Sequence, residues 1–266
     1  MACTYFSGND ALTMTLDNND FNLTRSWQVI YNFMFCIPGK SHTLGDIVIS
    51  NNRFFHGERP NRIITGFFEM SGPINVTFQN NVFNAYVEGS FGALVRLFSW
   101  KFLCHPIDEV PVYFTFERNT VSYSSPDQIV AGSLAAIIDQ RFLGRDIHIL
   151  YDGNTWENLH CKYSGVKISL ASKSLIILLY HSAKASSRSI IRNTTFRNVA
   201  VSEDDMLMAK MSGLGAIEID GIVYDNCTSL IELRTASLMK LHNVIIKNTL
   251  VVNSLTMHIN ADNVEM

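Results

Sequence analysis

A short pattern of apolar and polar positions recurs along this chain, and residues 75–84 show it clearly. Val76 and Phe78 alternate with polar residues, an Asn pair follows, and Phe83 lies five positions after Phe78. Alternation with a period of two places successive side chains on opposite faces of a β-strand. The pattern therefore predicts a strand that points Val76 and Phe78 into a core, a corner at the Asn pair, and a return to the core at Phe83.

The same pattern occurs nine times, each time around one central apolar residue that we call the anchor. The residue after the anchor is polar in all nine copies, and the residue two positions before it is apolar in every copy except the one with Ser189. One face of each copy is therefore expected to be exposed and the other buried. The anchors are Leu16, Ile49, Phe78, Phe116, Tyr151, Ile191, Ile219, Leu241 and Ile259.

The spacing of the anchors predicts a repeat structure. Consecutive anchors are between 18 residues (Leu241 to Ile259) and 40 residues (Tyr151 to Ile191) apart. The shorter spacings fit one coil of a parallel β-helix, and the longer ones imply loop insertions. An Asn or Gly lies two or three positions after every anchor except the last. These residues tolerate the left-handed backbone region that a sharp corner requires, and stacked Asn side chains can hydrogen-bond from copy to copy.

The segments between the copies predict the remaining walls of the coils. Gly92–Leu97 and Ala171–Tyr180 are apolar enough to form further strands. Residues 24–45 interrupt the pattern and are expected to form a cap or a side insertion. This interruption is either a short helix or a buried strand, because several of its apolar residues fall at helical spacing. They are Trp27, Ile30, Tyr31 and Met34.

Three segments, Ile49–Phe54, Phe78–Phe83 and Ile191–Phe196, carry a resemblance that covers most of residues 12–264. The chain resembles the right-handed parallel β-helix superfamily with the pectin-lyase-like fold, and the Phe-x-Asn-Asn repeats of polymorphic outer-membrane and adhesin-type passenger domains. The resemblance implies an all-β, right-handed, single-stranded parallel β-helix of about nine irregular coils with loop insertions. The competing fold is an antiparallel sandwich, which needs tight hairpin turns.

Composition narrows the functional classes. Only 17% of the residues are charged and the net charge is −3, so no basic face for nucleic acid is expected. The N-terminus lacks the basic and apolar regions of a signal peptide, and the longest apolar run, Leu175–Tyr180, is too short to span a bilayer. Five scattered cysteines without a C-x-x-C motif indicate buried thiols. We expect residues 1–266 to form a single domain that is a fragment or one module of a larger chain or assembly.

Four sequons predict sites of N-glycosylation and weigh towards an extracellular or cell-surface location. Their asparagines are Asn22, Asn75, Asn193 and Asn226.

The resemblance implies that, in an enzyme of this fold, a polysaccharide would lie across one exposed sheet. Ionisable residues on the predicted outward face concentrate in the later copies, at Arg192, Glu218, Asp220, Lys240 and His242. As a catalytic set, Glu218 and Asp220 would form an acid/base pair or a Ca²⁺ site, and Arg192 or Lys240 would bind an acidic sugar. As a structural set, opposite charges on neighbouring strands would stabilise each other by about 0.2–1 kcal/mol per pair. The second interpretation is favoured.

Other candidate residues favour structural roles. Glu203–Asp205 is similar to the paired aspartates of polygalacturonases, but it lies in a predicted loop and is better explained as a solvated turn. Trp27, Trp100 and Trp156 could stack on sugars, but Trp156 occupies an inward position and is expected in the core.

We therefore predict a noncatalytic structural or interaction module, with a polysaccharide lyase or glycoside hydrolase as the alternative. A viral or phage spike is a third hypothesis that would require trimer contacts. No cofactor is expected outside the lyase alternative. The last copy, Met257–Val264, has no capping helix after it. Because the terminal strand of a β-stack exposes unpaired backbone, a further chain or domain is expected to stack on it, and carbohydrate is a second candidate partner.

Overall fold

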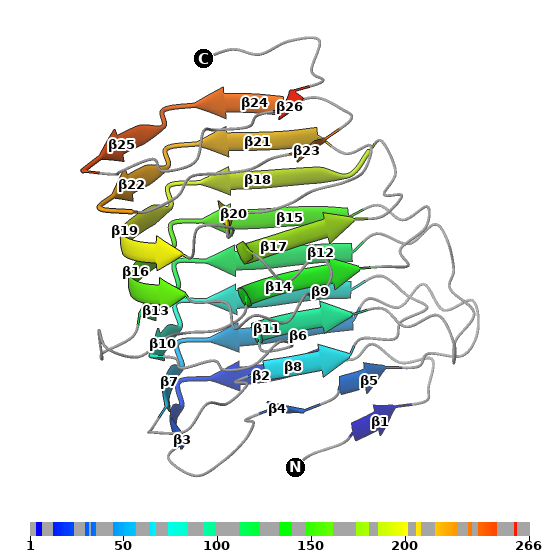
Figure 1. Cartoon of the computed structure of the whole chain (residues 1–266). Helices are drawn as coiled ribbons and strands as arrows, with labels where there is room; N and C mark the ends of the chain where they lie inside the picture. Colours follow the sequence, from blue (N-terminus) through cyan, green and yellow to red (C-terminus); the bar gives the residue numbers. More distant parts are fainter. Residues whose placement is uncertain are drawn as a thin grey trace, which may run out of the picture.

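The described residues of the computed structural model form β-strands and the short connections between them (Figure 1). Within this part of the chain there is no helix, and hence none long and apolar enough to cross a membrane. The structure describes residues 4–6, 13–23, 30–31, 33–35, 45–56, 64–67, 74–84, 93–98, 112–122, 133–139, 147–161, 174–180, 186–201, 206–208, 216–227, 234–235, 239–248 and 258–259.

Eight of the nine anchors lie on one eight-stranded sheet, which we call the anchor sheet. Its strands follow chain order from one edge to the other, as the colours of Figure 1 show. They are β2 (Thr13–Asp17), β6 (Gly45–Ser50), β9 (Ile74–Gln79), β12 (Val112–Glu117), β15 (Ile147–Asp152), β18 (Arg188–Arg192), β21 (Ala216–Asp220) and β24 (Met239–His242).

A second eight-stranded sheet, the aromatic sheet, begins directly after each corner and runs in the same order. We call an anchor strand and the aromatic-sheet strand after it a rung. The strands of this sheet are β3 (Asp20–Leu23), β7 (Arg53–His56), β10 (Val82–Asn84), β13 (Thr120–Ser122), β16 (Thr155–Cys161), β19 (Thr195–Val201), β22 (Val223–Asp225) and β25 (Ile245–Lys247).

A third sheet has six strands, and two further pairs complete the described fold. The third sheet contains β4 (Ile30–Tyr31), β8 (Ile64–Phe67), β11 (Ala93–Phe98), β14 (Ser133–Asp139), β17 (Ser174–Tyr180) and β20 (Met206–Met208), and the two pairs are β1 (Thr4–Phe6) with β5 (Phe33–Phe35) and β23 (Arg234–Thr235) with β26 (His258–Ile259).

Every strand pairing in the described residues is parallel. This excludes the antiparallel sandwich for this part of the chain. The anchors pair in register from rung to rung; for example, Phe116 lies opposite Phe78 on one side and Tyr151 on the other. An all-β chain with parallel strands stacked in chain order is consistent with the predicted β-helix solenoid.

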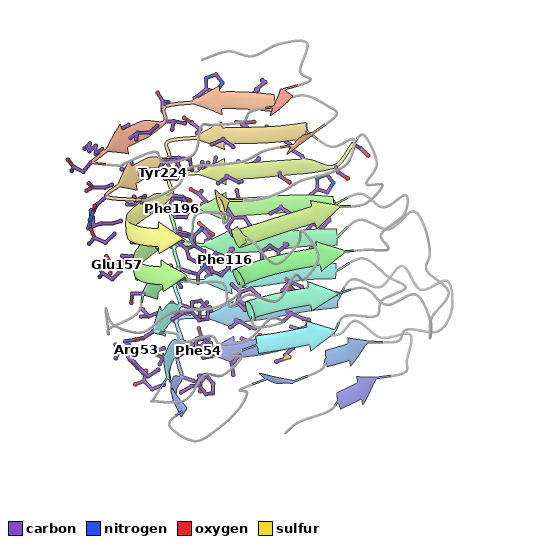
Figure 2. The ribbon with its side chains drawn as sticks, viewed as in Figure 1. Arg53, Phe54, Phe116, Glu157, Phe196 and Tyr224 are labelled. Carbon is purple, nitrogen blue, oxygen red and sulfur yellow. The ribbon has the colours of Figure 1, made fainter. Side chains whose placement is uncertain are left out.

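The core lies on the inner faces of the two eight-stranded sheets. Anchors of the interior rungs, such as Phe78 and Phe116, are at most 2% exposed. Five positions after the anchor, a column of aromatic rings fills the aromatic-sheet side, and Trp156 is fully buried there as predicted. In Figure 2, Phe54, Phe116, Phe196 and Tyr224 lie between the sheets, whereas Arg53 and Glu157 project outwards.

The aromatic column is interrupted at one rung, where its member is Val121. The ring of Phe116 spans this interruption, because its centroid lies 6.2 Å from that of Phe83 and 6.0 Å from that of Trp156. Elsewhere consecutive rings stack directly, as for Phe54 on Phe83 at 5.0 Å. The aromatic contacts therefore form one continuous chain through the core.

The predicted corners have left-handed backbone. In the eight rungs, the residue two positions after the anchor has a φ angle between 49° and 66°. Five of the eight are Asn, two are Gly and one is Arg. The residues are Asn18, Asn51, Asn80, Arg118, Gly153, Asn193, Gly221 and Asn243.

The residues three positions after the first five anchors form a hydrogen-bonded column, the inner Asn ladder. Each of the first four Asn residues donates its backbone N–H and its Nδ2 to the Oδ1 of the next, over 2.9–3.3 Å. From the second member on, Nδ2 also donates to the anchor carbonyl of the preceding rung, over 2.7–2.9 Å. These bonds satisfy polar groups buried at the corner. The ladder is Asn19, Asn52, Asn81, Asn119 and Asn154.

A second column, the outer Asn ladder, begins where the inner one ends. Asn158, Asn198 and Asn226 all have positive φ. The Nδ2 of Asn198 donates to Asn158 Oδ1 over 3.0 Å, and that of Asn226 to Asn198 Oδ1 over 2.9 Å. The sequence does contain a signal for this ladder, because an Asn lies seven positions after each of the last four anchors on the anchor sheet. The corner pattern, which extends only to the residue five positions after the anchor, does not include it.

The structure departs from the predicted repeat at the ninth copy. Ile259 does not extend the anchor sheet, because β26 pairs with β23 and places Ile259 opposite Thr235. This copy is also the one without Asn or Gly two or three positions after its anchor, so it lacks the residue that makes the corner. In the region 24–45, the described residues belong to strands; β4 joins the third sheet through β8, and β5 pairs with β1.

Candidate functional site

The candidate site is the outward face of the anchor sheet, where side chains form straight rows across the rungs. The row after the anchors contains the polar residues that follow the first eight anchors in the sequence. Parallel pairing in register brings each of them beside the equivalent residue of the next rung. The row is Asp17, Ser50, Gln79, Glu117, Asp152, Arg192, Asp220 and His242.

Asp152 and Arg192 form the clearest ion pair of this face. Arg192 Nη2 and Nε each lie 2.8 Å from Asp152 Oδ2, and Asn193 Nδ2 donates to Asp152 Oδ1 over 2.9 Å. Partial burial of Asp152 opposes ionisation, but the hydrogen bonds from Arg192 and Asn193 outweigh it and lower the pKa of Asp152 below its ordinary value. The same pairing raises the pKa of Arg192.

The structure distributes the five predicted site residues over the last three rungs of the anchor sheet. Glu218 lies opposite Lys240, and Asp220 lies between Arg192 and His242 in the same row. Each of the two carboxylates has a partner on a neighbouring rung. Glu218 forms an ion pair with Arg188, and Asp220 Oδ1 accepts a hydrogen bond from Asn243 over 2.8 Å.

Sequence reasoning missed Arg188, although it carries the ion pair with Glu218. Arg188 lies three positions before its anchor, Ile191. The outward rows predicted from the sequence were only those one position before and one position after each anchor, so this third outward row was not included. The same row contains Tyr113 and His148, whose rings stack 5.0 Å apart at 16°. Tyr113 remains 42% exposed. Extending the outward rows by one alternation towards the start of each strand would have found all three residues.

Polar contacts also connect the earlier rungs. Asp17 Oδ1 accepts hydrogen bonds from Ser50 Oγ over 2.6 Å and from Asn51 Nδ2 over 2.8 Å. These bonds lower the pKa of Asp17. Further along, Gln79 donates to Glu117 over 3.3 Å, and Glu117 pairs with Arg118 at 2.8 Å. Contacts between rungs therefore occur along most of this face.

No group of three or more His, Cys, Asp or Glu residues suited to a metal ion occurs in the described ranges. Ca²⁺ takes six to eight oxygen ligands. A calcium site based on Glu218 and Asp220 would therefore need further oxygen donors beyond these two carboxylates.

The remaining predicted sites fall partly within the structure. Glu203–Asp205, Trp27 and Trp100 lie outside the described residues, as do Met257 and residues 260–264 of the last copy. Among the sequons, Asn22 lies on β3, Asn75 is half-buried on β9, and Asn193 and Asn226 are exposed at corners.

The fold and this face are those of an all-β repeat protein with parallel strands, in which equivalent side chains of successive strands form ladders. Comparison of the chain with protein families, curated proteins and solved structures finds no match.

The Asp152–Arg192 pair predicts a pH-dependent contribution to stability. Because the pKa of Asp152 is lowered in the folded chain, the pair stabilises the fold above the ordinary aspartate range and loses this effect as the pH falls through the lowered pKa. Arg192→Met should cost up to about 1 kcal/mol at neutral pH, since the arginine side chain is about half exposed and solvent screens the pair. Urea unfolding of both proteins should show the difference shrinking below about pH 4. Arg197→Met, at an exposed arginine of β19, is the matched control, and a difference that grows on acidification would contradict the assignment.

Proposed function

We propose that this chain is a noncatalytic structural or interaction module, built as a right-handed parallel β-helix of the pectin-lyase-like superfamily. The observation that carries the proposal is the pairing on the outward face. Asp152, Glu218 and Asp220 each have an arginine or asparagine partner from a neighbouring rung. Such contacts hold adjacent rungs together, which is the role expected of side chains in a rigid stack.

The protonation of this face supports the same proposal. A general acid needs a carboxyl group with a raised pKa. Hydrogen bonds lower the pKa of two carboxyl groups on this face, those of Asp17 and Asp152. They are thus stabilised as anions, which suits ladder contacts rather than proton donation.

One observation favours the alternative, a polysaccharide lyase or glycoside hydrolase. The stacked rings of Tyr113 and His148 offer an exposed aromatic surface on the same face as Glu117, Asp152 and Arg192. Aromatic faces beside polar groups suit sugar rings, whose faces are apolar and whose rims carry hydroxyl groups.

Activity assays separate the two functions. The chain should release neither reducing ends nor unsaturated products from neutral and uronate polysaccharides, in the presence or absence of Ca²⁺. Glu218→Ala should change the free energy of unfolding by no more than about 1 kcal/mol, because its ion pair with Arg188 is partly exposed. Turnover by the wild-type chain that Glu218→Ala or Asp220→Ala abolishes, while both variants stay folded, would establish the enzyme instead.

A further inference from the structure

Among the described strands, the two eight-stranded sheets have an open edge at each end. There β2 and β3 at one end, and β24 and β25 at the other, pair with a described strand on one side only. Ile245 and Ile246 of β25 remain 45% and 49% exposed, whereas the equivalents of Ile246 in the interior rungs are at most 1% exposed. At the first rung, the anchor Leu16 is only partly covered. An open strand edge is a template for pairing with another strand.

The two open edges are complementary in their apolar residues. Ile246 occupies the last position of the aromatic column, and Phe21 occupies the first. Phe21 stacks on Phe54 at 5.0 Å on its inner side, but it is itself only half-buried. If a first rung followed the last one in the same register, the side chain of Ile246 would lie over Phe21. The column would then continue, and both residues would lose their contact with water.

The edges are also complementary in charge. Outward side chains at the last rung include the cations Lys240 and Lys247, and those at the first rung include the anions Asp17 and Asp20. Extending the observed register places His242 opposite Asp17 and Ile245 opposite Asp20, with Lys240 and Lys247 each one alternation away. Charges of alternating sign already follow one another in the later rungs, at Asp152, Arg192 and Asp220. Opposite charges on adjacent strands are mutually stabilising.

One series of backbone hydrogen bonds at the corners runs in one direction along the stack, from an N–H of one rung to a carbonyl of the next. Within the chain, the corner N–H of each rung donates to a carbonyl of the next rung, as Asn18 N does to Ser50 O over 3.1 Å and Gly221 N to His242 O over 3.3 Å. Continued by one rung, the series would pair Asn243 N with the Asp17 carbonyl of a following copy. The last rung therefore presents a donor where the first presents an acceptor.

We propose that the partner of the open C-terminal edge is the N-terminal edge of a second copy of this chain, with β24 beside β2 and β25 beside β3. This rests on the proposed function as an interaction module and names its partner. A two-fold arrangement would instead bring Lys240 and Lys247 of two copies together, or Asp17 and Asp20 of two copies, and like charges on adjacent strands repel. The head-to-tail arrangement leaves one open edge at each end, so it builds a linear series of copies.

Two blocked variants test the proposal. Ile246→Glu places a carboxylate where Phe21 of the next copy would pack, and the double variant Asp17→Lys, Asp20→Lys puts cations opposite the basic edge. In sedimentation velocity, the wild-type chain should form larger species as its concentration rises. Each variant alone should be monomeric, with the association constant lowered roughly tenfold or more. Because each variant retains one functional edge, an equal mixture should form dimers that do not grow further.

Val82→Glu is the matched control, because Val82 is a 36% exposed apolar residue of the aromatic sheet away from both edges; it should associate like wild type. Circular dichroism checks that all variants stay folded. A monomeric wild type at all concentrations, or a mixture that does not dimerise, would overturn head-to-tail pairing. Dimers of either blocked variant alone would overturn it in favour of two-fold pairing. Polysaccharide turnover would overturn the proposed function without changing these results.

Discussion

Replacement of Asn119 by leucine should lower the free energy of unfolding by about 3–6 kcal/mol. Asn119 is fully buried in the middle of the inner Asn ladder. Its Oδ1 accepts from the backbone N–H and the Nδ2 of Asn81, over 2.9 and 3.0 Å, and its Nδ2 donates to the Phe78 carbonyl and to Asn154 Oδ1, over 2.9 and 3.3 Å. Leucine has a similar size but replaces none of these bonds, so several polar groups would be buried without partners.

The neighbouring Asn80 provides the control. It is exposed, has a φ angle of 55°, and its Nδ2 donates to Asn51 Oδ1 over 3.2 Å. Asn80→Ala should cost only about 1–2 kcal/mol, mainly because alanine is less favourable in left-handed backbone. Urea unfolding followed by circular dichroism measures both variants. Equal losses for Asn119→Leu and Asn80→Ala would contradict the structural role of the buried ladder.

Truncation of Trp156 to alanine should cost about 3–5 kcal/mol, the range for large aromatic residues in protein cores. Trp156 is fully buried, and its ring centroid lies 6.0 Å from that of Phe116 and 6.3 Å from that of Phe196. Removing the indole would leave a cavity and break the aromatic chain beside the interruption at Val121. Guanidinium unfolding measures the loss.

Two further substitutions test the reason for this loss. Trp156 Nε1 is buried without a hydrogen-bond partner, so Trp156→Phe removes an unsatisfied donor while it keeps an aromatic ring. It should cost less than about 1.5 kcal/mol. Tyr113→Ala removes a 42% exposed ring and should change stability by no more than about 0.5 kcal/mol. A Trp156→Phe variant as unstable as Trp156→Ala would show that the core needs the full indole at this position and that a smaller aromatic ring does not suffice.

The rungs could be predicted from sequence because their signals are local. The alternation around Phe78 identifies the inward face, and Asn80 and Asn81 identify the corner. Repetition then converts local signals into long-range register, because identical patterns stack most favourably with their anchors aligned. Trp156 could be assigned to the core for the same reason, through its position relative to Tyr151.

The contacts that were missed depend on pairings between rungs. The ion pair of Arg188 with Glu218 joins residues 30 positions apart and requires the register of β18 and β21. The pairing of β26 with β23 involves a separate two-stranded sheet that no repeat pattern describes. Under the enzyme alternative, the sequence also predicts Glu218 and Asp220 as an acid/base pair. Sequence spacing could place them on one face but could not assign Arg188 and Asn243 as their partners.

The one-after-another order of the rungs has a mechanical consequence. Among the described strands, each strand of the two eight-stranded sheets is paired only with strands of the rungs before and after it. A pulling force applied at the C-terminus would therefore load the bonds of the outermost rung first, while those of inner rungs stayed unstrained. The chain should yield in successive small steps, each releasing about one repeat of contour length at roughly 3.3–3.6 Å per residue. A protein built this way would absorb tension gradually rather than rupture in a single event.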